Sequence, residues 1–177
     1  MAAEAEIIRV LLLEDNMSMR VIIQTILHGL GAFEIHEAAD AVSASRIVRE
    51  RRIDLALVDF QLQDGDGVQF VRDVRRSPSD QLRFLPIIMV TGHSERLRVE
   101  EARDAGVSEF VAKPLTAQAL MSRLEAAVMR PRPFVSSAAY FGPDRRRRRA
   151  AVYTGPFRRK DDPQPAALDL ERGEVLI

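Results

Sequence analysis

Residues 53–60 read IDLALVDF, a short apolar run that ends at the carboxylate of Asp59. A run of this length without helical spacing is typical of a strand that is buried on both faces. Two similar runs occur elsewhere in the chain, IIRVLLL at 7–13 and PIIMV at 86–90. A proline at the first residue of a strand loses no ladder hydrogen bond, so Pro86 fits this interpretation. We therefore predict buried strands at 7–13, 53–58 and 86–90.

Helical patterns separate these runs. Apolar residues recur at helical spacing up to Leu30, with Asn16 or Ser18 as the candidate N-cap and glycines at the end. Two shorter strands are predicted at 33–36 and 110–112, and further helices at 40–49, 68–74, 94–105 and 116–129. Five strands that alternate with five helices predict an α/β fold, in which helices cover both faces of a parallel sheet. Crossovers in such a sheet are right-handed.

Polar side chains follow four of the predicted strands. They are Glu14 and Asp15, then Asp59, then Thr91, then Lys113. In open parallel sheets the functional crevice lies at the carboxyl ends of the strands, so we expect these groups to converge. Three neighbouring carboxylates repel one another unless a cation joins them, and Mg²⁺ is the hard oxygen-binding ion that fits best. A carboxylate beside such an ion can act as a nucleophile toward phosphorus, while a hydroxyl and an ammonium neutralise the developing charge.

Each of these residues has a simpler explanation when it is taken alone. A strand-end Asp often caps a helix, Thr91 is a common turn former, and Lys113 is an ordinary surface charge. The complete set favours a site, and the composition adds to it. The chain has 24 Arg but only two Lys, and Lys113 is the only Lys before residue 160. A compact ammonium suits a narrow pocket better than a planar guanidinium. The sequence has no glycine-rich phosphate loop, zinc-ligand spacing or Ser-His-Asp pattern.

The pattern of strand ends resembles the receiver domain of bacterial response regulators, and the resemblance covers about residues 7–130. The residues that carry it are Glu14-Asp15, Asp59, Thr91 and Lys113-Pro114. The resemblance implies a flavodoxin-like (βα)5 receiver fold, a five-stranded parallel sheet with strand order 2-1-3-4-5. It also implies that Asp59 accepts a phosphoryl group.

The same resemblance assigns the other site residues. Mg²⁺ would be held by Glu14, Asp15, Asp59 and the backbone carbonyl of Gln61. The switch and phosphoryl-binding residues would be Thr91, Lys113 and Phe110, although a half-buried core position is the simpler explanation of Phe110. The chain departs from the family in one place, since Leu62-Gln63 stands where the family often has Met-Pro. We expect the loop after Asp59 to be less rigid for that reason, while Gly67 matches the family's loop glycine.

The composition changes near residue 130, where Pro131 and Pro133 interrupt the chain. Residues 1–130 carry 16 basic and 20 acidic side chains, whereas residues 131–177 carry 10 basic and 6 acidic ones. We therefore expect a receiver domain at 1–130 and a Pro/Arg-rich C-terminal extension at 131–177 that is largely irregular. About 47 residues are few for an independent core.

The extension contains an internal repeat, Y-x-G-P-x-R-R, at 140–146 and again at 153–159. A Gly-Pro turn that presents an aromatic ring and two arginines predicts contacts with an acidic protein surface, either the receiver itself or a partner. The candidate contact residues are Tyr140, Arg145, Arg146, Tyr153, Arg158 and Arg159. A solvated basic tail and a nucleic-acid-binding tail are the alternatives.

Composition also bears on compartment and partners. The chain has no Cys, its first residues are acidic, and it has no apolar stretch long enough to cross a bilayer, so we expect a cytoplasmic protein without a membrane contact. We expect a two-component response regulator that takes its phosphoryl group from a histidine kinase or phosphotransfer protein, with Mg²⁺ as cofactor. It would be an enzyme only in its own phosphorylation and dephosphorylation. Its downstream protein is unknown, and we do not expect it to bind DNA. Besides a nucleic-acid-binding regulator, a small flavodoxin-like enzyme or cofactor binder is the remaining alternative function.

Overall fold

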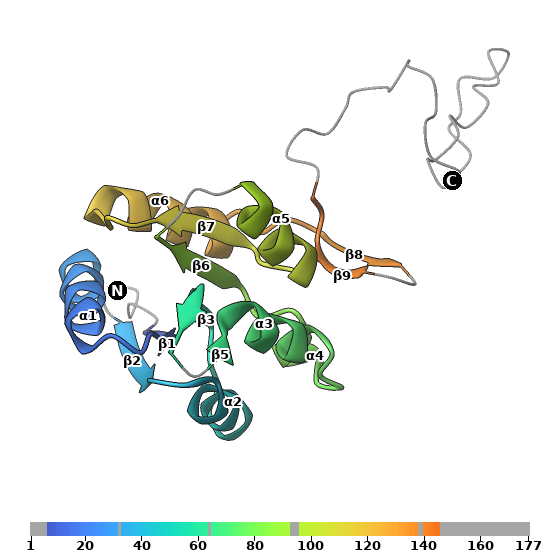
Figure 1. The fold of residues 1–177 in the computed structure, drawn as a ribbon, viewed down its shortest axis with the longest axis horizontal. Coiled ribbons are helices and arrows are strands. Elements are labelled where there is room, and N and C mark those ends of the chain that lie inside the picture. Colours follow the sequence, from blue (N-terminus) through green and yellow to red (C-terminus); the bar gives the residue numbers. More distant parts are fainter. Residues whose placement is uncertain (1–6, 32, 64, 93–95, 138–139, 146–177) are drawn as a thin grey trace, which may run out of the picture. The chain divides into compact units, whose positions relative to one another are not determined.

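A five-stranded parallel sheet forms the centre of the fold (Figure 1). The computed structural model describes residues 7–31, 33–63, 65–92, 96–137 and 140–145. The strands lie in the order β2-β1-β3-β6-β7, which is 2-1-3-4-5 when only the strands of this sheet are counted. Their bounds are β1 Ile8–Leu13, β2 Phe33–Ala38, β3 Leu55–Asp59, β6 Ile87–Thr91 and β7 Glu109–Ala112. The predicted fold class and strand order are therefore confirmed.

Helices cover both faces of this sheet (Figure 1). Helices α1 (Met17–Leu30) and α6 (Ala117–Val128) pack on one face. Helices α2 (Ala41–Glu50), α3 (Gly67–Arg75) and α5 (Arg96–Ala105) pack on the other. Helices α1, α2, α3 and α5 each lie in a connection between two parallel strands, as the alternating pattern predicts, and α6 follows the last strand of the sheet.

Alternation along the strands explains the two core layers. In β1, Val10 and Leu12 belong to the core under α1 and α6, whereas Leu11 and Leu13 belong to the core under α2, α3 and α5. All four side chains are almost completely buried. Successive side chains of a strand point to opposite faces, so a strand without polar residues can only be accommodated between two helical layers. Polar groups are consequently confined to the strand ends.

Five short elements of the structure are absent from the prediction. Short strands β4 (Gln61–Leu62) and β5 (Gly65–Asp66) pair antiparallel directly after β3, and α4 (Asp80–Arg83) is a single turn before β6. Strands β8 (Phe134–Ser137) and β9 (Tyr140–Pro143) form an antiparallel hairpin beyond α6.

The hairpin of β8 and β9 changes the predicted domain boundary. Residues up to Arg145 form one compact unit, which extends beyond the predicted boundary at residue 130, and residues 134–137 and 140–143 of the extension are strands. Its stability depends on contacts with residues about 50 positions away, such as Phe84 with Phe134, which local sequence patterns do not reveal. Of the predicted contact residues, Arg146, Tyr153, Arg158 and Arg159 lie outside the described residues.

Within the described part of the chain, every helix is too short or too polar to cross a membrane.

Candidate functional site

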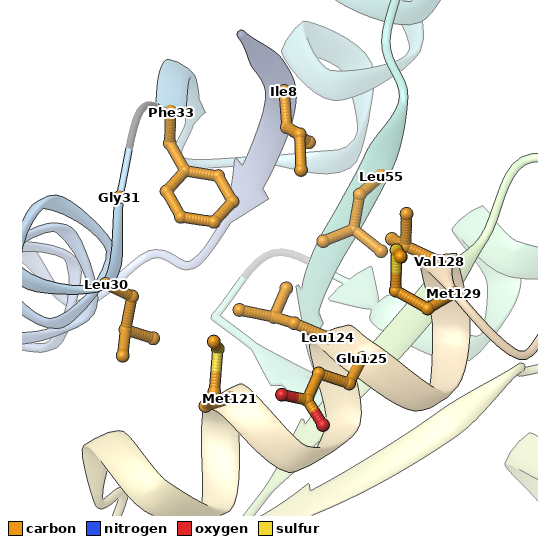
Figure 2. Close-up of a pocket in the computed structure, with 10 residues that line it drawn as sticks. All are labelled: Ile8, Leu30, Gly31, Phe33, Leu55, Met121, Leu124, Glu125, Val128 and Met129. Carbon is orange, nitrogen blue, oxygen red and sulfur yellow. The ribbon is translucent and has the colours of Figure 1, made fainter. Parts of the chain in front are cut away.

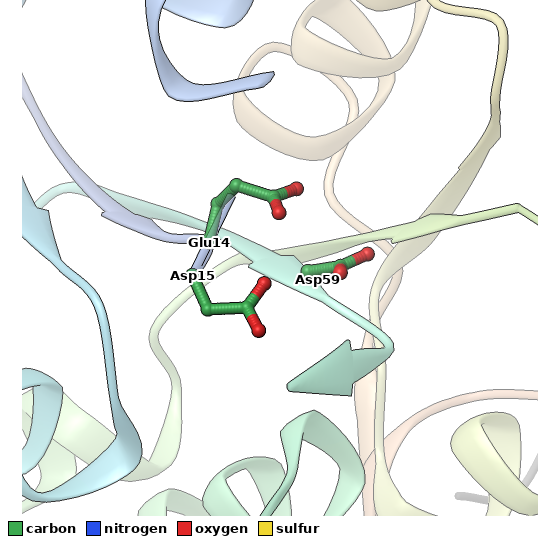
Figure 3. A group of neighbouring side chains, drawn as sticks. All are labelled: Glu14, Asp15 and Asp59. Atoms are coloured by element: carbon green, nitrogen blue, oxygen red, sulfur yellow. The ribbon is translucent and has the colours of Figure 1, made fainter. Parts of the chain in front are cut away.

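Three carboxylates converge at the carboxyl ends of β1 and β3 (Figure 3). Glu14 and Asp15 follow β1 directly, and Asp59 is the last residue of β3. One carboxylate oxygen from each residue lies within 4.8 Å of the other two. Glu14 and Asp59 are buried, with exposed fractions of 1% and 6%, whereas Asp15 is partly exposed. Three oxygen ligands at this spacing, open to solvent on the Asp15 side, suit a hard divalent cation that keeps some of its water.

Lys113 joins two of these carboxylates. Its ammonium Nζ lies 2.9 Å from Oδ1 of Asp59 and 3.1 Å from Oε2 of Glu14. The residue follows β7, and its backbone N–H donates to the carbonyl oxygen of Thr91 at 2.7 Å. The Lys113–Pro114 peptide bond is cis. The ammonium therefore holds Glu14 and Asp59 beside each other and offsets part of their repulsion.

Burial and mutual repulsion shift the titration of the buried carboxyls. Burial, and then the charge of Asp59, raise the pKa of Glu14 above its ordinary value, although Lys113 opposes the shift. Burial likewise raises the pKa of Asp59, again against Lys113. Burial lowers the pKa of Lys113, but its hydrogen bonds to Asp59 and Glu14 outweigh that effect, so the net shift is upward. Both acids thus hold their protons more tightly than exposed carboxyls, and a cation that binds them must compete with protons.

Asp15 is tied to the loop that follows the third central strand. Its Oδ2 accepts a hydrogen bond of 2.7 Å from the backbone N–H of Gln63. Gln63 occupies the position where the family often has proline, and a proline has no N–H to donate. The expectation of a less rigid loop after Asp59 did not include this hydrogen bond to Asp15. The pairing of β4 with β5 adds a second restraint on the same loop. No sequence pattern indicates such a bond, because it joins residues 48 positions apart.

The backbone of Asp59 is packed directly against the start of α3. A Cβ on Gly67 would overlap the carbonyl oxygen of Asp59 and would crowd the side chain of Val58 at 3.0 Å. The N–H of Gly67 donates to the carbonyl oxygen of Phe60 at 3.2 Å, which closes the turn. Glycine is thus required at this position for close approach, and the approach fixes the backbone of Asp59 relative to the helix.

The remaining predicted residues lie around this cluster. Thr91 ends β6 and is buried, with 6% of its surface exposed. Phe110 lies in β7 opposite Met89, is partly buried, and packs against the core under α3 and α5. Gln61 is in β4, two residues beyond Asp59, with an exposed side chain. The roles assigned to these residues stay predictions, but their positions are compatible with them.

A second hollow is chemically different. An apolar pocket of about 260 Å³ lies between α1 and α6 (Figure 2). The charged side chain in its lining is Glu125, which pairs with Arg130 at 3.8 Å. The pocket shares no residue with the carboxylate cluster; its lining consists of Ile8, Leu30, Gly31, Phe33, Leu55, Met121, Leu124, Glu125, Val128 and Met129.

Comparison with known proteins agrees with the fold and the cluster. The family model of the response regulator receiver domain matches residues 10–125, and the chain belongs to this family. It is 33% identical over 117 residues to the chemotaxis protein CheY of Pseudomonas aeruginosa, which covers 66% of this chain and 93% of that protein. The structure of CheY4 of Vibrio cholerae matches with a TM-score of 0.64 at 26% identity, over 69% of this chain and 99% of that one.

A third relative bears on the metal. The receiver domain of the sensor histidine kinase PA1611 of Pseudomonas aeruginosa PAO1 matches with a TM-score of 0.63 at 28% identity, over 70% of this chain and 99% of that one. That structure contains a magnesium ion coordinated in its active-site cleft. Receiver domains bind Mg²⁺ at an acidic pocket, and this chain has such a pocket at Glu14, Asp15 and Asp59. The chain is thus a receiver of two-component signalling with a metal-compatible cluster.

Proposed function

We propose that this protein is a response regulator that accepts a phosphoryl group on Asp59. The observation that supports this most strongly is the surroundings of that carboxylate. Asp59 ends a buried strand, an ammonium lies 2.9 Å from its Oδ1, and two more carboxylates stand within metal-ligand distance. A helix cap or a surface carboxylate needs neither the ammonium nor the acidic neighbours.

The proposed reaction is a transfer of the phosphoryl group without net oxidation or reduction. An oxygen of Asp59 forms a bond to phosphorus, while the bond from phosphorus to the donor's nitrogen or oxygen breaks and the donor keeps that electron pair. Mg²⁺, held by Glu14, Asp15, Asp59 and the Gln61 carbonyl, would neutralise negative charge on the phosphoryl oxygens. Lys113 pairs with the same oxygens, and the buried hydroxyl of Thr91 donates a hydrogen bond to them.

The proposed partners follow from this reaction. The donor is a histidine kinase or a phosphotransfer protein, and the signal passes on through protein contacts. We place the protein in the cytoplasm, where such donors expose their phosphorylated histidine. The nucleic-acid alternative gains no support from the described residues. Arg145, the described member of the arginine run, stacks on Tyr140 and pairs with Asp104 at 3.0 Å.

The direct test is phosphorylation by a small phosphodonor such as acetyl phosphate. Intact-mass spectrometry of the full chain should show one added phosphoryl group in the presence of Mg²⁺. Excess chelator should reduce the labelling rate at least about a hundredfold, because nothing then offsets the repulsion between the pocket and an incoming dianion. Equal labelling with and without chelator would contradict the proposed metal dependence.

We predict that Mg²⁺ raises thermal stability and that Asp15→Asn removes most of this effect. A ligand at a hundred times its dissociation constant stabilises the folded state by about 2.7 kcal/mol. Differential scanning calorimetry at neutral pH measures the change in melting temperature on addition of Mg²⁺. Asp54→Asn is the matched control, because Asp54 is an ion-paired carboxylate outside the cluster. An equal loss in both variants would contradict the assignment of Asp15.

The Mg²⁺ effect should also depend on pH. The raised pKa values of Glu14 and Asp59 mean that the folded chain binds more protons than the unfolded chain between the ordinary and the raised values. Without the ion, stability therefore falls as pH rises through that window. In the presence of Mg²⁺, binding of the ion adds stability as pH rises, because Mg²⁺ binds only the ionised carboxylates. We expect the stabilisation by Mg²⁺ to disappear as pH falls through the window.

We predict that Thr91→Ala separates phosphorylation from signalling. The variant keeps the acceptor, the carboxylates and Lys113, so labelling should proceed at a rate within about tenfold of the wild type. It loses the hydroxyl that donates to the phosphoryl group, so the structural response should be confined to the pocket. Amide chemical shifts measured before and after labelling test this. In the wild type, changes should reach Phe110 and α5; changes of equal extent in Thr91→Ala would refute the switch role.

A further inference from the structure

The hairpin of β8 and β9 is seated at the end of the sheet opposite Asp59. It contacts residues that precede β6 and β7, whereas the carboxylates follow the other ends of the strands. The ring of Phe84 lies 4.9 Å from that of Phe134 and 5.3 Å from that of Phe141, both edge-on. The guanidinium of Arg83 lies 4.0 Å above the ring of Phe141. One aromatic ring, Phe84, thus contacts both strands of the hairpin, and a neighbouring cation, Arg83, contacts the second strand.

The closest approach is between two glycines. A Cβ on Gly142 would lie 2.9 Å from the Cα of Gly106 and 2.6 Å from the hydroxyl oxygen of Tyr140. Gly106 has a φ of +100°, and a Cβ there would lie 3.1 Å from the carbonyl oxygen of Phe141. Neither position accepts a side chain without displacement, because each meets one backbone atom of the other segment, and the side chain of Tyr140 or of Arg75 occupies the remaining space. The hairpin therefore meets the end of α5 backbone to backbone.

A buried arginine lies under this contact. Arg75 is 4% exposed, and its guanidinium donates to the carbonyl oxygens of Gly106, Arg83 and Leu85 at 2.8 to 3.0 Å. Burial lowers its pKa to about 9. It also lies 5.1 Å from the centre of the Phe134 ring, so the hairpin covers it. The carbonyl oxygen of Gly106 is therefore held on one side by the arginine, while the hairpin packs on the other.

The segment 140–145 is braced by its own side chains. The hydroxyl of Tyr140 donates to the carbonyl oxygen of Pro143 at 2.7 Å, which folds the ring back over the glycine between them. The guanidinium of Arg145 lies 3.9 Å from the centre of the Tyr140 ring and 3.0 Å from Oδ1 of Asp104. Three named positions of Y-x-G-P-x-R thus have contacts that depend on residue type. Tyrosine supplies a ring and a donor, glycine supplies space, and arginine supplies the charge that reaches α5, whereas the acceptor at Pro143 is a backbone carbonyl that any residue has.

Two observations indicate that this segment is a separable unit. The family match ends at residue 125, before the hairpin begins, so the shared receiver fold does not include it. The sequence also contains the form Y-x-G-P-x-R a second time, at 153–158. A segment that merely completed one core would not need to recur with its tyrosine, glycine, proline and arginine in register.

We propose that the surface formed by Arg83, Phe84, Asp104 and Gly106 is a recognition site for Y-x-G-P-x-R segments, and that residues 140–145 are its ligand within the chain. The site selects by three features. The Gly106 backbone admits only glycine opposite it, the carboxylate of Asp104 pairs with arginine, and the aromatic wall favours an apolar residue after tyrosine. The phosphoacceptor chemistry of Asp59 is independent of this site.

The test uses the full chain with Gly142→Val, which should release the hairpin because the added side chain collides with Gly106. The probe is a synthetic peptide with the sequence of residues 132–145. We expect the peptide to shift the amide signals of Phe84, Asp104 and Gly106 in this variant. In the wild type the attached segment competes for the site at an effective concentration of about 1 mM, so the peptide should bind at least about tenfold more weakly than in the variant.

Controls distinguish specific recognition from nonspecific peptide binding and from misfolding. The same peptide with its own Gly142→Val change should not bind, and a peptide with the sequence of residues 151–160 should shift the same amides more weakly, since Thr154 replaces Phe141. If Gly142→Val does not unfold cooperatively, Tyr140→Ala replaces it, because that change removes the ring without adding bulk. Absence of peptide shifts in a folded release variant overturns the proposal, as does equal affinity for variant and wild type. Labelling of Asp59, measured in parallel, shows separately whether the phosphoacceptor function holds.

Discussion

Asp59→Asn should abolish phosphoryl uptake completely. The amide has nearly the size of the carboxylate and preserves the end of β3, but its oxygen is a poor nucleophile toward phosphorus. The change also removes one of the three carboxylates of the cluster, which is the ionic partner of Lys113 at 2.9 Å. Intact-mass spectrometry after incubation with acetyl phosphate and Mg²⁺ should show no added phosphoryl group in the variant.

The matched control for this result is Asp80→Asn. The Asp80 side chain is 82% exposed and lies in α4, away from the carboxylate cluster, so this variant should label like the wild type. Full labelling of Asp59→Asn would refute the acceptor assignment. Labelling of that variant on Glu14 or Asp15, located by peptide mapping, would instead show that the cluster is correct and the acceptor within it is not.

Gly67→Ala should be the most destabilising single-methyl change in the receiver. The new Cβ would overlap the carbonyl oxygen of Asp59, and neither backbone can withdraw easily because β3 is paired on both sides up to Val58, Asp59 is paired with β6, and α3 is packed. Overpacking against a fixed backbone costs about 3 kcal/mol. Urea unfolding should show this loss as a lower midpoint, and labelling of Asp59 should slow because its carboxylate moves.

Gly29→Ala is the control: it adds the same methyl group but should raise stability instead of lowering it. Gly29 lies within α1, and a Cβ there has no atom within 4 Å. Alanine in a helix interior is favoured over glycine by about 0.5 to 1 kcal/mol, and Gly29 lies in the last turn of α1, so this variant should be more stable than the wild type by less than that amount. If both glycine variants changed stability by the same amount, the close approach at Gly67 would not be the cause.

Local pattern predicted the parallel sheet well, for a physical reason. Residues 10–13, 55–58 and 87–90 of three central strands are buried on both faces, so this part of each strand is continuously apolar, unlike a surface element. The cap of α1 was equally readable, since Asn16, one of the two candidates, accepts the backbone N–H of Met19 at 3.0 Å. The hairpin at 134–143 was missed because its strands are short and half exposed. Its stability comes from distant aromatic residues on the receiver.

The candidate site also has features that the sequence predicted and one that it did not. Strand ends and residue type were enough to bring Glu14, Asp15 and Asp59 together, because parallel strands share one edge. They also indicated that Lys113 would lie beside Asp59. The bond from Gln63 to Asp15 could not be foreseen, because a backbone N–H has no signature in the side-chain sequence.

The position of Lys113 also determines the electroneutrality of the pocket. When all groups are ionised, three carboxylates and one ammonium leave two negative units. A divalent cation brings this set to zero, so the metal-bound resting pocket exerts little net field on the rest of the domain. An acyl phosphate carries about one negative unit more than the carboxylate it replaces. The difference between the two signalling states is therefore about one elementary charge, located where the apolar core ends and the solvent begins.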